Sequence, residues 1–588
     1  MKRILALTLC VFMLVSAAAG CGTTAVTPSA TAAPAASSAA AVESTAAAAT
    51  AEATAAAAGT VTEPGTFPVV KDKVTYKAVV ATGPFVEDMF TNKFTTFYEE
   101  KTNVHIEWQV ISEQGAAEKV SIILASGDLP DFFMNASVPD IEVKYGTQEG
   151  LIIPVDDLIK NNMIYLQEAM ATYPVGSMDT MRQVDGKLYG LPTMTDCFHC
   201  ANAAKMWINQ KWLTKLGLAI PTTTAEFEAV LKAFKEKDPN GNGKQDEIPL
   251  VGAIKGGWNN TVDKFLLNSF LYYDMDINPD TDAGTQAGWF LTPDKKVDTA
   301  LNKDAYKAGL TWLNSLYKQG LLYDGSFTQD ATQLTQLIEN PDAELVGCVP
   351  GGWGGTFAKV PGERYSQYVS IAPLKGPDGQ QNAITFPQLP YNTLWITNVA
   401  KNPEVIARWA DWLYTVEGSL TVRRGFKDVA WRDPKDGEMG INGKPAVWTQ
   451  LIPWNDSEPQ NETWTRLGPF AETDGLRLGQ TTDLKLERTS MEGLELFLYE
   501  QTAKNYRPYA QFDKVVQPLK FSDATMSELV TMKVEFGKYV KQANVEFITG
   551  KKDLAKDWDA YLTGLESVGL PKILEIYNAA YSSIYAAK

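Results

Sequence analysis

Residues 74–134 alternate between strand and helix patterns, and this alternation strongly limits the folds available to the chain. Residues 74–81, 104–111 and 131–134 read as strands, and residues 87–100 and 116–125 as helices, with Gly127 ending the second helix. This β-α-β-α-β order predicts an α/β fold with a doubly wound, mostly parallel sheet. Such sheets bind ligands at the carboxyl ends of their strands, so a cleft is expected there.

The first 20 residues read as a secretory leader. Lys2 and Arg3 precede an apolar run at residues 4–15, and small residues at 18–20 come directly before Cys21. The apolar run is too short to span a bilayer comfortably. A cysteine in this place is typical of bacterial lipoproteins, in which the thiol receives a diacylglycerol after cleavage. We therefore predict a signal peptide at 1–20 and lipidation of Cys21.

Residues 22–67 consist almost entirely of Ala, Thr, Ser and Pro. Such a tract has nothing large and apolar to bury, so it predicts a disordered stalk, which we assign to residues 21–72. The alternative is an Ala-rich helix, because alanine has the best helix propensity. The interspersed Thr, Ser and Pro and the lack of an apolar stripe favour the stalk.

The charge and cysteine content narrow the class of protein. The net charge of the chain is -17, and loss of Lys2 and Arg3 with the leader would make it more negative. This charge repels nucleic acid and anionic lipid, so neither is an expected partner. Cys197, Cys200 and Cys348 are too few for a disulfide scaffold. More than five hundred residues after the stalk are enough for two lobes.

Several short motifs occur in a fixed order along the chain: ASGDLPD at 125–131, DGKLYGLP at 185–192 and WINQKWL at 207–213, with further ones up to residue 561. Together they resemble the family 1 extracellular solute-binding proteins of ABC importers, and specifically their large lipoprotein branch, which includes oligosaccharide-binding proteins with a calcium loop. Each motif is weak alone, but their order along one chain is specific. The resemblance covers residues 73–588.

The resemblance implies a type II periplasmic-binding-protein-like fold with two lobes and a helix-rich C-terminus. Lobe 1 would comprise 73–194 and 391–425, and lobe 2 would comprise 195–390 and 426–588. The chain would cross between the lobes near 192–196, 388–395 and 423–431. The implied protein is a monomeric, non-enzymatic receptor on the extracellular face of the cell membrane, held by its lipid anchor, which closes on a ligand and delivers it to the permease subunits.

Residues 238–247, with the sequence DPNGNGKQDE, form the most explicit candidate metal site. Oxygen side chains alternate with a glycine suited to a tight turn, as calcium requires. Position twelve of an EF-hand loop would be Pro249, so the loop is not a standard EF-hand. The resemblance implies a structural Ca²⁺ ion, and its implied ligands are Asp238, Asn240, Asn242, the Lys244 carbonyl, Asp246 and Glu247. The alternative is a polar turn without metal.

Tryptophans provide the candidate ligand contacts. Sugars stack their C–H faces on aromatic rings while their hydroxyls bind polar groups. Trp258 and Trp353 lie in glycine-rich runs, where the glycines could let the backbone approach a ligand, and Trp395 lies at an expected crossing. Trp409, in contrast, follows the apolar stripe of a helix and reads as core. We predict that the ligand is a carbohydrate, and favour an oligosaccharide; the alternatives are a peptide or a small modified sugar.

Other candidate chemistry is sparse in the sequence. The run Cys197-Phe198-His199-Cys200 could bind zinc, but without a second Cys/His pair a local disulfide or buried thiols are favoured. Neither a P-loop nor a Ser-centred nucleophile elbow occurs. The competing hypothesis is a surface glycoside hydrolase or lyase that uses the same aromatic cleft, because two carboxylates need only meet in space.

Overall fold

The computed structural model describes residues 61–585 except 139–140, 174–177, 274–287, 387, 453–458, 484, 488–489 and 491. The predicted leader, Cys21 and most of the predicted stalk lie outside these residues. Within the described part, no helix is both long enough and apolar enough to cross a bilayer.

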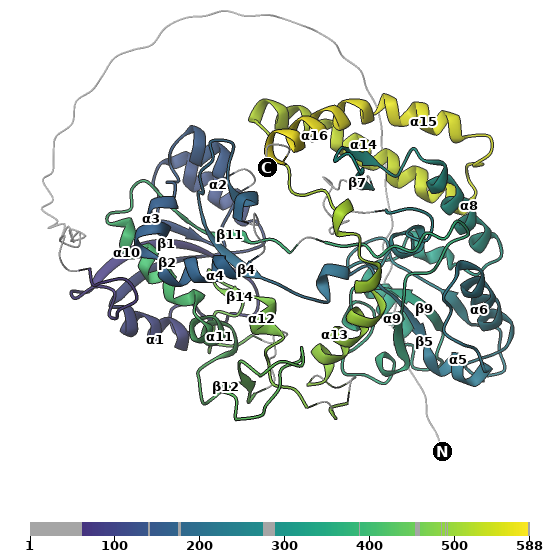
Figure 1. Ribbon diagram of the computed structural model, residues 1–588, viewed down its shortest axis with the longest axis horizontal. Coiled ribbons are helices and arrows are strands. Elements are labelled where there is room, and N and C mark those ends of the chain that lie inside the picture. Colours follow the sequence, from purple (N-terminus) through teal and green to yellow (C-terminus); the bar gives the residue numbers. More distant parts are fainter. Residues whose placement is uncertain are drawn as a thin grey trace, which may run out of the picture. The chain divides into compact units, whose positions relative to one another are not determined.

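A six-stranded sheet forms the first of two α/β bodies (Figure 1). Its strands, in spatial order, are β14 (Ala471–Glu472), β4 (Leu191–Thr195), β11 (Tyr391–Ile396), β3 (Phe132–Met134), β1 (Val74–Thr82) and β2 (Val104–Ser112). The three strands expected near the start of the fold are confirmed to within one residue at each end. The sheet also includes strands from three later parts of the chain.

Both faces of this sheet are covered by helices. In β1, alternate residues such as Val74 and Tyr76 enter one core, whereas Val79 and Ala81 enter another. The first core includes residues of α1 (Lys93–Thr102), α3 (Asp156–Asn162), α4 (Ile164–Thr172) and α10 (Pro403–Asp411), and the second includes residues of α2 (Ala116–Ser126). The two-residue period of a strand explains this division.

Helix α1 starts six residues later than residue 87, where the sequence pattern placed it. The Asn92 side chain caps the helix by accepting a hydrogen bond from the Phe94 backbone N–H at 3.0 Å. Before it, Asp88 accepts from the Phe90 N–H at 2.7 Å and so holds a turn. Phe90 is 62% exposed, so its aromatic ring is not part of the apolar helix face. Local side-chain capping therefore overrides the apparent helical periodicity.

A four-stranded sheet forms the second body. Its order is β10 (Tyr368–Ile371), β5 (Met206–Asn209), β9 (Val346–Pro350) and β6 (Ile248–Leu250). Its large core includes residues of α6 (Thr224–Glu236), α8 (Asp304–Lys318) and the C-terminal helices α14 (Asp523–Thr549), α15 (Trp558–Ser567) and α16 (Leu570–Tyr585). The last three helices pack on one another, which confirms the helix-rich C-terminus (Figure 1).

The expected α/β class is confirmed. Both sheets are mixed: the first is mostly parallel as expected, because β1–β2, β1–β3 and β4–β14 all pair in parallel, whereas the second is mostly antiparallel. In the first sheet, β11 runs antiparallel to both β3 and β4. In the second, β5 runs antiparallel to both β9 and β10, and only β6 and β9 pair in parallel. Strand β11 enters its sheet from the other body and not through a crossover helix, so the βαβ rule does not set its direction.

Two expected boundaries differ from the structure. Strand β14 pairs with β4, and Trp464, Leu467 and Phe470 join the core of the first body, so this segment does not belong to lobe 2 as expected. A two-residue strand has no sequence pattern that could reveal this pairing.

The stalk assignment to residue 72 also extends too far. Val69 and Val70 are buried, the Val69 N–H donates to the Thr102 carbonyl at 2.9 Å, and Val61 forms a bridge with Val70. The fold therefore includes residues 61–72, because burial of the Val69 and Val70 side chains removes apolar surface from water.

Candidate ligand and cation sites

Trp258 is half-buried and lies where several segments of the second body meet. It packs against Ala203, Ala204, Ile384 and Phe386. Its carbonyl accepts a hydrogen bond from the Gly352 N–H at 2.8 Å. The structure thus brings the Trp258 segment beside the glycine-rich run that contains Trp353.

The glycines near the two tryptophans make room for their rings. A Cβ atom on Gly352 would lie 2.2 Å from the Trp258 ring, and one on Gly355 would lie 2.4 Å from the Trp353 ring. This role was not predicted from the sequence, and the approach of the backbone to a ligand stays a prediction. Trp353 is half-buried and packs against the core around Trp207.

Trp395 is a core residue in this structure, contrary to its expected contact with ligand. Its side chain is only 5% exposed and packs in the core that contains Phe133 and Tyr145. Its indole N–H donates to Glu142 Oε1 at 3.1 Å. Trp395 therefore has no open ring face for a sugar, and it instead positions a carboxylate.

Sequence reasoning missed the polar cluster around Glu142. The Asn392 side-chain amide donates to Glu142 Oε1 at 2.6 Å, and the Gln183 amide donates to Oε2. The pairing register of β11 shifts between Asn392 and Leu394, so Asn392 and Trp395 reach the same carboxylate although they are three residues apart. Tyr391, the residue before Asn392, is 53% exposed. Polar Tyr391 and Asn392 just before Trp395 were the only hint of a polar cluster in this part of the sequence. The register shift that brings Asn392 and Trp395 to the same carboxylate was not predictable.

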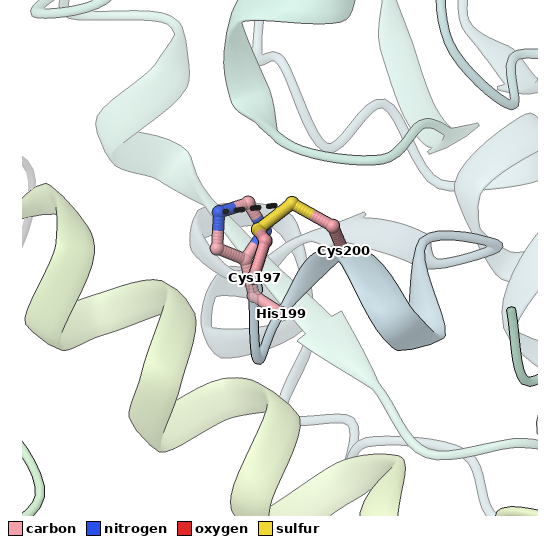
Figure 2. Close-up of side chains that lie close together, drawn as sticks. All are labelled: Cys197, His199 and Cys200. Atoms are coloured by element: carbon pink, nitrogen blue, oxygen red, sulfur yellow. Dashed lines mark hydrogen bonds between the residues drawn. A yellow bond between two sulfur atoms is a disulfide. The ribbon is translucent and has the colours of Figure 1, made fainter. Parts of the chain in front are cut away.

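Cys197 and Cys200 form a disulfide with a Cα–Cα distance of 5.1 Å. Figure 2 shows the His199 ring beside it, with Cys200 Sγ at 3.8 Å from Nε2. Because the sulfurs are bonded to each other, they are not thiolate ligands, and of the alternatives left open the local disulfide is confirmed. His199 is buried, and burial lowers the pKa of its imidazole to about 3.

Buried charge pairs lie next to the disulfide. Arg477 of α12 (Asp474–Arg477) forms an ion pair with Glu495 at 2.9 Å, and an Arg477 guanidinium nitrogen lies 3.5 Å from His199 Nε2. Arg423 and Arg424 both pair with Glu472, which is 4% exposed. Burial alone would raise the pKa of Glu472, but the two arginines outweigh it and lower the pKa to about 2.

The loop at 238–247 folds around its own oxygen atoms. Asp238 accepts hydrogen bonds from the backbone N–H groups of Gly241 and Gly243 at 2.9 and 3.1 Å, and Asn242 Oδ1 accepts from the Lys244 N–H at 2.8 Å. The Asn240 side chain donates to Asp246 at 2.9 Å. The structure therefore brings these predicted ligand residues together.

Glu247 provides the test of whether a cation fits this loop. Both of its carboxylate oxygens are buried and have no hydrogen-bond partner. Its pKa is raised by burial and further by the carboxylates of Asp238 and Asp246. Buried anions without a partner are costly, and a divalent cation bound by Glu247 would offset that cost. The donor set therefore fits calcium, a hard cation that binds oxygen ligands.

Comparisons with known proteins relate this geometry to a family. A model described as bacterial extracellular solute-binding protein matches residues 73–419. The fructooligosaccharide ABC transporter substrate-binding protein FusA of Streptococcus pneumoniae is 28% identical over 536 residues, which cover 89% of this chain and 93% of that protein.

Solved structures show the same fold. FusA in complex with kestose superposes with a TM-score of 0.68 at 25% identity, covering 87% of this chain and 100% of that one. An EF-hand mutant of FusA in complex with fructo-nystose has a TM-score of 0.65 at 25% identity, with the same coverage. A solute-binding protein of Bifidobacterium longum infantis, described as binding HMO, has a TM-score of 0.70 at 21% identity, covering 87% and 99%.

Proposed function

Because the chain belongs to the bacterial extracellular solute-binding protein family, we propose that it is the receptor of an ABC importer that captures an oligosaccharide and delivers it to a membrane permease. The observation that carries this proposal is the match to FusA along nearly the whole of both chains. A match of this extent is too long to be confined to one of the two α/β bodies.

The binding mechanism that we propose is closure of the two bodies on the ligand. The chain passes between them after β4 and again before β11, and β14 returns to the first sheet. Closure would need changes in backbone angles at only a few residues of these crossings. Trp258, half-buried beside the first crossing, would offer a ring to the sugar, and Tyr391 and Asn392 would face it from the first body.

We propose a fructooligosaccharide as the first ligand class to test, because FusA is described as binding such sugars. Aromatic rings beside amides and carboxylates suit a neutral sugar, whose C–H faces stack while its hydroxyls form hydrogen bonds. No positive charge is required for this recognition, in keeping with the acidic chain.

A calcium ion in the loop at 238–247 forms part of the proposal, with a structural role. Asp238, Asn240, Asn242, the Lys244 carbonyl, Asp246 and Glu247 would hold it. The unpartnered Glu247 carboxylate supports this assignment, as does the existence of an EF-hand mutant of FusA. When bound, the ion would neutralise the three carboxylates and stabilise the loop against helix α6.

Lipid anchoring through Cys21 is also proposed, on the strength of the leader sequence. Replacing Cys21 with Ser should move the protein from the membrane fraction to the soluble fraction without altering ligand affinity. Unchanged membrane retention would refute the anchor and leave the receptor function untouched.

Titration calorimetry with kestose and a panel of other oligosaccharides tests the function directly. We expect saturable binding of at least one sugar and no shorter products by chromatography after prolonged incubation. Loss of the sugar with release of shorter fragments would instead support the hydrolase or lyase alternative. Absence of binding to any sugar of the panel would refute the proposed ligand class.

A further inference from the structure

The disulfide Cys197–Cys200 closes a short loop directly after the first crossing strand, β4. Within the loop, the Cys197 carbonyl accepts backbone hydrogen bonds from Cys200 and Ala201 at 2.9 and 3.1 Å. The backbone thus makes a tight turn, and the disulfide locks it (Figure 2). The shape of this turn sets the direction in which the chain enters the second body.

Residues after the disulfide contact the other segments that surround Trp258. The Ala201 carbonyl accepts from the Phe386 N–H at 2.8 Å, and the Asn202 amide donates to the Ile384 carbonyl at 2.9 Å. Both partners lie in the segment that leads to the second crossing strand, β11. The disulfide loop therefore couples the first two crossings.

The same loop is tied to the glycine-rich run that contains Trp353. The buried Lys205 ammonium donates to the carbonyls of His199 and Asn202, both at 2.6 Å. The Lys205 carbonyl accepts from the Gly351 N–H at 3.0 Å. The His199 ring also lies 6.3 Å from the Trp258 ring, centre to centre. A change in the disulfide loop would thus reach both tryptophan segments through direct contacts.

The three cysteines of the described residues differ in how far they are exposed to solvent. Cys197 is 6% exposed and Cys348 is fully buried, whereas Cys200 is only partly buried. Thiol–disulfide exchange requires that an incoming thiolate reach one sulfur, so Cys200 Sγ is the accessible target. Arg477, Lys205 and Glu495 lie near the loop, so its surroundings include charged groups.

We propose that Cys197–Cys200 is a thiol–disulfide exchange site, and that its reduction by an external dithiol weakens ligand binding. The second part rests on the proposed receptor function. One thiolate of the dithiol attacks Cys200 Sγ, the disulfide bond breaks, and Cys197 leaves as a thiolate that takes a proton from water. The second thiolate of the reductant attacks the mixed disulfide and releases Cys200. Two electrons pass to the protein, and the dithiol becomes a cyclic disulfide.

Native alkylation tests the exchange step on the folded wild-type protein. After treatment with dithiothreitol and then iodoacetamide without denaturant, mass spectrometry should find Cys200 alkylated and Cys348 unmodified. Cys348 is the internal control, because a buried thiol reacts only if the protein unfolds. An unreduced disulfide under conditions that keep the protein folded would overturn the exchange site.

Calorimetry tests the effect on binding. The sugar that binds the oxidised protein should bind the reduced protein at least about fivefold more weakly, the lower end of typical coupling between sites. The Cys197→Ser, Cys200→Ser variant should match the reduced protein and ignore the reductant. A change of less than fivefold overturns the coupling, whereas failure of the oxidised protein to bind any sugar would refute the proposed function instead. The wild-type measurement stands even if the variant does not fold.

Discussion

Replacement of Glu247 by Gln should have opposite effects on stability with and without calcium. Both carboxylate oxygens of Glu247 are buried without a hydrogen-bond partner. Leaving a buried polar group unsatisfied costs about 1–3 kcal/mol. Glutamine has nearly the same shape without the charge, so it removes the repulsion from the carboxylates of Asp238 and Asp246. In a chelator, E247Q should therefore be more stable than the wild type by about 1–2 kcal/mol.

Calcium should reverse that order. An ion present at about 100 times its dissociation constant stabilises the folded state by about 2.7 kcal/mol if it binds only that state. The wild type should gain this amount, whereas E247Q, which has lost one carboxylate ligand, should gain much less. The assay is urea denaturation of both proteins, once in EGTA and once in saturating calcium chloride.

The matched control is Glu236→Gln in the helix that precedes the loop. Glu236 is exposed, so the same chemical change there should alter stability by less than about 0.5 kcal/mol and leave the calcium response intact. If E247Q in EGTA is no more stable than the wild type, the carboxylate is satisfied in solution and the reasoning fails. If the wild type shows no response to calcium, the loop is a plain turn.

Three further predictions concern the tryptophans, the buried ion pairs and the histidine. Trp258→Ala should weaken sugar binding, measured by calorimetry, by about fivefold to more than a hundredfold, as for an aromatic anchor worth about 1–3 kcal/mol. The control is Trp409→Ala: this core residue is 2% exposed, so melting curves should show a loss of about 3–5 kcal/mol of stability, while the affinity of the folded protein stays unchanged. Glu472→Gln should destabilise by about 3–5 kcal/mol in urea titrations, because it leaves the buried Arg423 without its anion; a loss below about 1 kcal/mol would contradict this. The pKa of His199 falls from the ordinary 6.5 to about 3 on folding, so on acidification the unfolded chain takes up a proton first. The contribution of neutral His199 to stability is therefore present above pH 6.5 and should be lost as the pH falls towards 3. His199→Gln should flatten this part of the plot of unfolding free energy against pH, and an unchanged plot would show that other groups cause it.

Much of the fold could be predicted because burial leaves a period in the sequence. The strands near the start of the first body alternate between two cores, and the helix containing Trp409 carries an apolar stripe, so both were predictable from the pattern of apolar residues. The meeting of oxygen side chains in the loop at 238–247 was also predictable, because these residues lie close together in a short stretch of chain.

The remaining features depend on contacts between segments that are distant in sequence. Gly352 and Gly355 leave room for the rings of Trp258 and Trp353. Trp395 is buried in a core that includes residues of α2, which is distant along the chain. Strand β14 joins its sheet with only two residues. No local pattern distinguishes a tryptophan that faces a ligand from one that fills a core, and this is why the candidate site was predicted less well than the fold.

The segment at 61–70 attaches the start of the described chain to the helices of the first body. The Arg408 guanidinium of α10 donates to the Glu63 carbonyl, and the Phe67 ring packs edge-on against Trp412 at 6.4 Å between ring centres. Lys101 of α1 lies 4.5 Å above the same Phe67 ring. A pull on residue 61 therefore acts first on helices α1 and α10 of the first body. Under the proposed anchor and the proposed closure, the first body would therefore stay fixed, and the second body would move and carry the loop at 238–247 with it.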